Sequence, residues 1–142
     1  MRTLQLIVAI SSALLLSMVF TAEAHADTGT ASFNATVTAV SSSCQDEGIE
    51  LGTRAKLDVS RSNDRLTMRL QGAPAMTGKV RRGGKFRLKF ASRQPNAAGV
   101  RGNFSATGRV SAERIGLVLV VEYYKNGKAQ CSQSWDIAGE KR

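Results

Sequence analysis

Residues 85–90 of the chain are Lys-Phe-Arg-Leu-Lys-Phe, and they alternate strictly between cationic and apolar side chains. Successive side chains of a β-strand point to opposite faces, so this stretch predicts a strand with one buried face and one fully cationic face. The same two-residue period recurs along most of the chain after residue 31. Alternating runs cover residues 32–39, 54–59, 65–71, 76–81, 100–110, 115–123 and 129–137.

Turn-forming residues separate these runs, and no helical periodicity of useful length lies between them. The strongest hairpin signal is Asn126-Gly127, because both residue types tolerate the positive φ angles of a type I′ turn. About eight short strands with turns between them predict an all-β fold, a single antiparallel meander. We expect the meander to close into a barrel, with a β-sandwich as the alternative.

The first 26 residues have the composition of a secretory signal peptide. Arg2 supplies a positive start, residues 4–20 are almost entirely apolar, and Ala24-His25-Ala26 forms an A-x-A cleavage site. The alternative is an uncleaved membrane anchor, but the apolar run is short for a span. We therefore expect residues 1–26 to be a signal peptide and residues 27–142 a single β-barrel domain. No second apolar run of that length follows, which predicts a periplasmic or secreted product with no integral membrane segment after cleavage.

The chain contains two cysteines, Cys44 and Cys131. An even number of cysteines in an exported protein predicts a disulfide bond, with two free thiols as the alternative. In an up-and-down barrel with an even number of strands, the first and last strands are antiparallel neighbours, so the end of one lies beside the start of the other. Cys44 follows the first run and Cys131 lies near the start of the last, as closure requires. The same reasoning predicts that Phe33 and Trp135 meet at the opposite end. The expected shape resembles lipocalin- or avidin-like barrels in architecture, without the Gly-x-Trp of a lipocalin first strand.

The residues after the signal segment do not suggest an enzyme. The single histidine, His25, lies within residues 1–26, which leaves none for a Ser-His pair, a general base near neutrality or a typical zinc site. We therefore predict a protein without catalytic residues, bound metal or cofactor.

Positive charge is concentrated in the middle of the chain. The formal net charge is +9, and residues 54–101 hold thirteen bases against two acids. Because consecutive strands of a meander are neighbours, we expect the outward-facing cations to share one curved face. The predicted polyanion-binding residues are Arg69, Lys79, Arg81, Lys85, Arg87, Lys89 and Arg101.

Such a face attracts acidic glycans, lipopolysaccharide and acidic protein surfaces. Nucleic acid is disfavoured, because the phenylalanines of these strands have the inward parity and are not available to stack on bases. The alternative interpretation is a solvated strand face whose cations prevent edge-to-edge aggregation. We expect an exported, non-enzymatic binding protein.

The barrel interior is the second candidate binding region. Eight-stranded barrels are either filled by side chains or hold one small ligand. Apolar residues with the inward parity are Leu57, Val59, Leu66, Met68, Leu70, Phe86, Leu88, Phe90 and Leu119. The alternative function is therefore a lipocalin-like carrier of a small apolar ligand.

The run at residues 115–123 also carries apolar residues on its outer face. Val118 and Val120 have the outward parity, and we expect a terminus or the loop around Asn96 to bury them, with a partner surface as the alternative.

Overall fold

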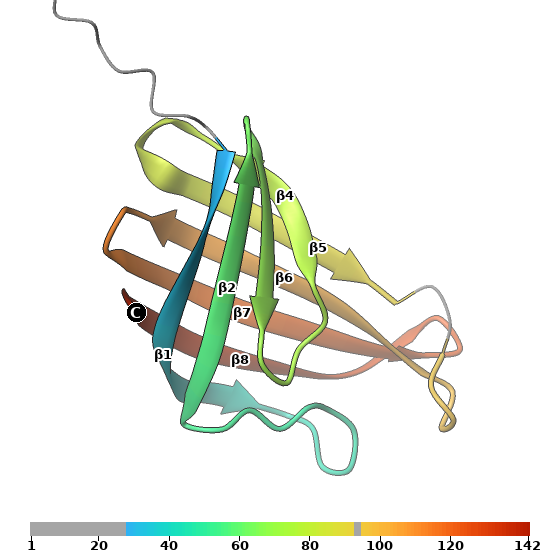
Figure 1. Cartoon of the computed structure of the whole chain (residues 1–142). Coiled ribbons are helices and arrows are strands. Elements are labelled where there is room, and N and C mark those ends of the chain that lie inside the picture. Colours follow the sequence, from blue (N-terminus) through green and yellow to red (C-terminus); the bar gives the residue numbers. More distant parts are fainter. Residues whose placement is uncertain (1–27, 93–94) are drawn as a thin grey trace, which may run out of the picture.

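The computed structural model describes residues 28–92 and 95–142, so the predicted signal peptide (1–26) lies outside the described residues. This part of the chain forms eight antiparallel strands, shown in Figure 1. The strands are β1 (Thr28–Ser42), β2 (Arg54–Ser62), β3 (Arg65–Leu70), β4 (Met76–Val80), β5 (Lys85–Ala91), β6 (Val100–Val110), β7 (Arg114–Lys125) and β8 (Lys128–Lys141). A short 3-10 turn, η1 (Arg82–Gly84), connects β4 to β5.

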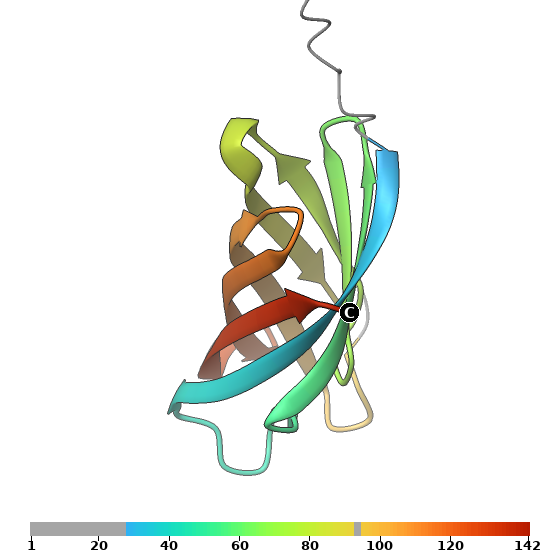
Figure 2. The same cartoon turned by 60° about the vertical axis from the view of Figure 1, so that its left-hand side comes forward.

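The strands form a closed barrel in which each strand pairs with the next and β8 pairs with β1. The predicted meander barrel is therefore confirmed, and the sandwich alternative is wrong. The long strand β1 closes it: residues 28–36 pair with β2 and residues 33–42 pair with β8. Figure 2 shows β1 running between these two neighbours.

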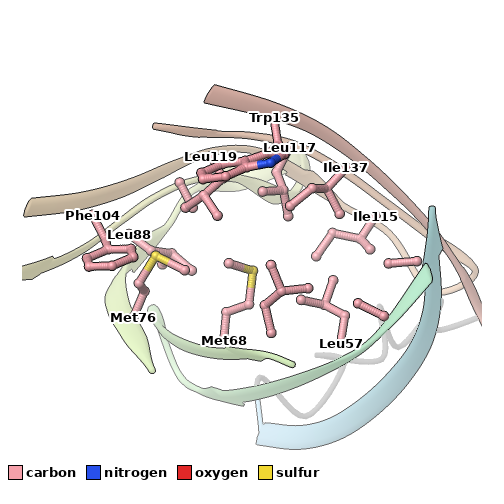
Figure 3. Packing of buried hydrophobic residues seen from close by; sticks show 14 of the residues in the cluster. Leu57, Met68, Met76, Leu88, Phe104, Ile115, Leu117, Leu119, Trp135 and Ile137 are labelled. Atoms are coloured by element: carbon pink, nitrogen blue, oxygen red, sulfur yellow. The ribbon is translucent and has the colours of Figure 1, made fainter. Parts of the chain in front are cut away.

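The interior is filled with apolar side chains contributed by every strand (Figure 3). Strict alternation places them there, as the burial pattern of β2 shows: Ala55, Leu57 and Val59 are buried and the residues between them are exposed. Within the described residues, no polar or charged residue is buried. One core prediction is wrong. Phe90 is 36% exposed, because β5 ends at Ala91 and Phe90 therefore lies at the rim, edge-on to Phe104.

A disulfide bond joins Cys44 to Cys131, which confirms the predicted pairing. The loop between β1 and β2 lies at this end of the barrel and is held by a small polar network. The Ile49 N–H donates to Tyr123 Oη at 2.9 Å and to Gln133 Oε1 at 3.1 Å. The Tyr123 hydroxyl in turn donates to Gln133 Oε1 at 2.8 Å. Burial of Tyr123 raises its pKa above the ordinary value of 10.0, and the Ile49 donor partly offsets that rise.

The predicted hairpin turn between β7 and β8 is confirmed, with φ angles of 52° at Asn126 and 76° at Gly127. The expected meeting of Phe33 and Trp135 is wrong. Phe33 pairs with Lys141, and Trp135 pairs with Ala39. The last strand extends four residues beyond the alternating run that ends at Ile137, so the C-terminal residues lie beside Phe33.

Candidate functional site

Five of the seven predicted cations lie together on the outer surface of the β4–β5 hairpin. Lys79 is on β4, Lys85, Arg87 and Lys89 are on β5, and Arg81 is in the connection between the strands. All five side chains are exposed. The alternation that buries Phe86 and Leu88 forces the cations between them to point outward.

The strand register places these cations in two crossing rows. Across the sheet, Arg65 of β3 pairs with Lys79, and Lys79 pairs with Arg87. Adjacent strands are about 4.8 Å apart, so the three side chains form a close row. Along β5, Lys85, Arg87 and Lys89 are spaced about 7 Å apart, two residues each time. Arg87 belongs to both rows.

No carboxylate residue is paired with these cations across the strands of the described register. Arg65 faces Ser62 on its other side, Lys85 faces Arg109, and Arg87 faces Thr107. Lys89 lies between Thr77 and Ser105. We call this surface the cationic wall and define it by seven residues: Arg65, Lys79, Arg81, Lys85, Arg87, Lys89 and Arg109.

The cationic wall contains a groove of about 460 Å³. Lys79, Arg81, Lys85 and Arg87 line it, together with Phe86 and Thr107. The groove exists because Thr107 is short, whereas the cations beside it on β5 are long. Four cations around one hollow can hold an anionic group such as a carboxylate, sulfate or phosphate by charge-assisted hydrogen bonds.

Two of the predicted binding residues lie outside the cationic wall. Arg69 is paired across the strands with Asp58, whose Oδ1 also accepts a hydrogen bond of 2.7 Å from Ser32 Oγ. Arg101 is paired with Tyr124, whose hydroxyl donates to Glu122 at 2.7 Å. This hydrogen bond to a carboxylate, with the charge of Glu122, raises the pKa of Tyr124. Arg69 therefore lies opposite a carboxylate, and Arg101 lies opposite a tyrosine that is hydrogen-bonded to one.

Two members of the cationic wall, Arg65 and Arg109, were not among the binding residues predicted from the sequence. Both have the outward parity of their strands, and this was the signal that could have identified them. They belong to the cationic wall because the strand register pairs Arg65 with Lys79 and Arg109 with Lys85.

The outer face of β7 and β8 differs from the cationic wall. It carries Glu122 and Asp136, and both acids border the cationic wall. Glu122 lines a hollow with Arg87 and Lys89, and Asp136 lines one with Lys85 and Arg109. The expectation that Val118 is buried under a terminus or loop is wrong, since Val118 is 44% exposed. Val120 is half-buried. Small neighbours explain this, because Thr107 pairs with Val118 and does not cover it.

The described residues carry no grouping of three or more His, Cys, Asp or Glu side chains placed to hold a metal ion. Residues 28–92 and 95–142 also include no helix with the length and apolarity needed to cross a membrane. None of the protein-family models, curated proteins or solved structures compared with this chain matches it.

Proposed function

We propose that this protein is an exported, non-enzymatic binding protein that docks an acidic envelope polymer, or an acidic protein surface, on its cationic wall. The observation that carries the proposal is the row Arg65–Lys79–Arg87, in which cations face one another directly across three neighbouring strands. Like charges in directly opposed positions of a sheet destabilise it. A bound polyanion would relieve this repulsion, so binding and folding would favour the same arrangement.

Acidic glycans, including lipopolysaccharide, suit the cationic wall best. Its hollow is lined by cations and by the hydroxyl of Thr107, and sugar acids offer both anionic groups and hydroxyls. Nucleic acid is disfavoured, because single-stranded binding relies on exposed aromatic platforms. Phe86 is buried beneath the cations, and Phe90 packs against Phe104 at the rim.

The interior offers a small apolar ligand little room. The side chains that fill it are completely buried, among them Phe33, Leu57, Met68 and Leu119, each with 0% of its surface exposed. This packing favours the outer surface over the lipocalin-like carrier function. The Cys44–Cys131 disulfide is compatible with an oxidising, exported location, which supports a periplasmic or secreted site of action.

The test is retention of the purified protein on an immobilised acidic glycan over a salt gradient. The variant Lys85→Glu/Arg87→Glu/Lys89→Glu removes one row of the cationic wall. The matched control Lys125→Glu/Lys128→Glu/Arg142→Glu makes the same charge change elsewhere. We expect the wild type and the control to elute at high salt and the wall variant to elute at a clearly lower salt concentration than either. Equal elution of the two variants would show that net charge alone drives retention, and the proposal would fail.

A further inference from the structure

A second hollow, of about 820 Å³, lies on the outer face where β1 passes between β2 and β8. We call it the corner groove. The register aligns its residues in two rows across β2, β1, β8 and β7. One row comprises Lys56, Asn34, Glu140 and Arg114, and the next comprises Arg54, Thr36 and Ala138. All of these side chains are exposed.

The depth of the corner groove follows from side-chain length. Of the four middle positions, on β1 and β8, three carry the short residues Asn34, Thr36 and Ala138, and the fourth carries Glu140. The β2 side carries the long cations Arg54 and Lys56. A floor of short residues beside long ones makes the hollow, and Arg114 borders it on the β7 side.

The chemistry of the corner groove is that of a site for an acidic sugar. Arg54, Lys56, Arg114 and Lys141 line it, against one acid, Glu140. These cations can bind carboxylate or sulfate groups. Asn34 and Thr36 can hydrogen-bond to sugar hydroxyls, and Glu140 can only accept hydrogen bonds when ionised. A ligand with both anionic groups and hydroxyl donors can bind to the cations and also donate hydrogen bonds to Glu140, whereas polyphosphate provides no donors for Glu140.

The corner groove and the cationic wall lie on opposite sides of the barrel. The wall is centred on the neighbouring strands β4 and β5, and the groove is centred on the neighbouring strands β8 and β1. In a closed ring of eight strands, these two pairs are separated by half of the circumference. Figure 2 shows β1 with β8 and β2 on either side of it. One straight stretch of polymer therefore cannot occupy both sites.

We propose that the protein is bivalent and cross-links chains of an acidic polysaccharide, one chain on the cationic wall and a second in the corner groove. This inference rests on the proposed function for the wall, and it adds the second site and the bridging activity. Two sites on one rigid barrel hold two chains together without any contact between copies of the protein.

The experiment uses a soluble linear polyuronate and measures binding and light scattering separately. Wild-type protein should bind the polymer and raise its scattering, with a maximum at an intermediate ratio of protein to polymer and a decline in protein excess. The groove variant Arg54→Glu/Lys56→Glu should still bind through the wall but lose the rise in scattering. The variant Arg114→Glu/Lys141→Glu, from the other side of the groove, should behave in the same way.

The control Lys125→Glu/Lys128→Glu makes the same charge change at the β7–β8 turn and should scatter as the wild type does. If the groove variants scatter as strongly as the wild type, the inference is overturned. That result is the one expected if a dimer of the protein bridged the chains through its two walls. Wild-type binding without any rise in scattering would overturn the inference and leave the proposed function standing. A wild-type protein that does not bind the polymer would contradict both.

Discussion

Cys44 and Cys131 are bonded with their Cα atoms 5.0 Å apart, and the bond joins the chain just after the first strand to the beginning of the last strand. It therefore reinforces the β1–β8 pairing that closes the barrel. It also fixes one end of the loop between β1 and β2. The Tyr123–Gln133 network holds the same loop at Ile49.

Loss of this disulfide should destabilise the barrel strongly. The two cysteines are 87 residues apart in sequence, and closing a loop of that size contributes on the order of 4 kcal/mol in the chain-entropy treatment. We expect Cys44→Ser/Cys131→Ser to lower the free energy of unfolding by about that amount, measured by urea denaturation. Reduction of the wild type should reproduce the effect and leave the double variant unchanged. Equal stability of the oxidised wild type and the variant would contradict this role.

Gly108 permits a close approach between β6 and β7. A Cβ atom at this position would clash with the Gly116 carbonyl oxygen and would lie 2.8 Å from Leu117 Cβ. Since backbone atoms cannot move aside cheaply, Gly108→Ala should destabilise the protein by about 1–3 kcal/mol. Gly116→Ala is the matched control, because a Cβ atom added at Gly116 would have no other atom within 4 Å. Thermal unfolding of both variants tests the contrast, and similar melting temperatures would contradict it.

Tyr123 should make the protein less stable at alkaline pH. Burial raises its pKa above 10.0, so the folded state holds the phenolic proton more tightly than the unfolded chain does. The associated stability is fully present below pH 10.0 and is lost as the pH rises through the higher folded-state pKa. Tyr123→Phe should unfold more easily at neutral pH, by about 1 kcal/mol for the lost hydrogen bonds, and should show a shallower decline above pH 10.

Denaturation midpoints measured across this pH range test the prediction for Tyr123. The chain has two tyrosines, so the Phe variant leaves Tyr124 alone for an absorbance titration that separates the two phenols. Parallel decline of wild type and variant above pH 10.0 would assign the alkaline instability to other groups.

The two-residue alternation was sufficient to predict which side chains point inward on most strands. It failed at strand ends, where parity does not decide burial: Phe90 has the inward parity but lies at the rim. It also failed for Phe33 and Trp135, because their placement depends on how far β8 extends beyond the alternating run. The cysteine positions and the even strand number correctly predicted closure.

The candidate site was only partly predictable for the same reason. Parity showed that Lys79, Arg87 and Arg69 point outward, but not which of them lie beside an acid. The register decides this by pairing Arg69 with Asp58 and Lys79 with Arg65 and Arg87. Both grooves depend on short residues of one strand meeting long residues of another, and this information is not present in any single run of sequence.

The repulsion within the cationic wall leads to opposite predictions for two similar substitutions. Lys79 faces cations on both sides, so Lys79→Gln should stabilise the protein by about 0.2–1 kcal/mol at low salt. High salt should abolish the gain, because exposed charges are screened. Arg69 faces Asp58, so Arg69→Gln should leave the stability unchanged or lower it. Both variants lose one positive charge, and a general effect of net charge would shift both in the same direction.

The same pair of variants separates folding from binding. If the repelling cations of the row Arg65–Lys79–Arg87 serve to bind the ligand, Lys79→Gln should be more stable than the wild type and should bind an acidic glycan more weakly. Arg69→Gln should bind nearly as the wild type does, because Arg69 lies outside the cationic wall and opposite Asp58. Urea denaturation at low and high salt, with retention on the immobilised glycan, measures both quantities on each variant. A Lys79→Gln protein that gains stability without losing affinity would show that the repulsion serves no binding role.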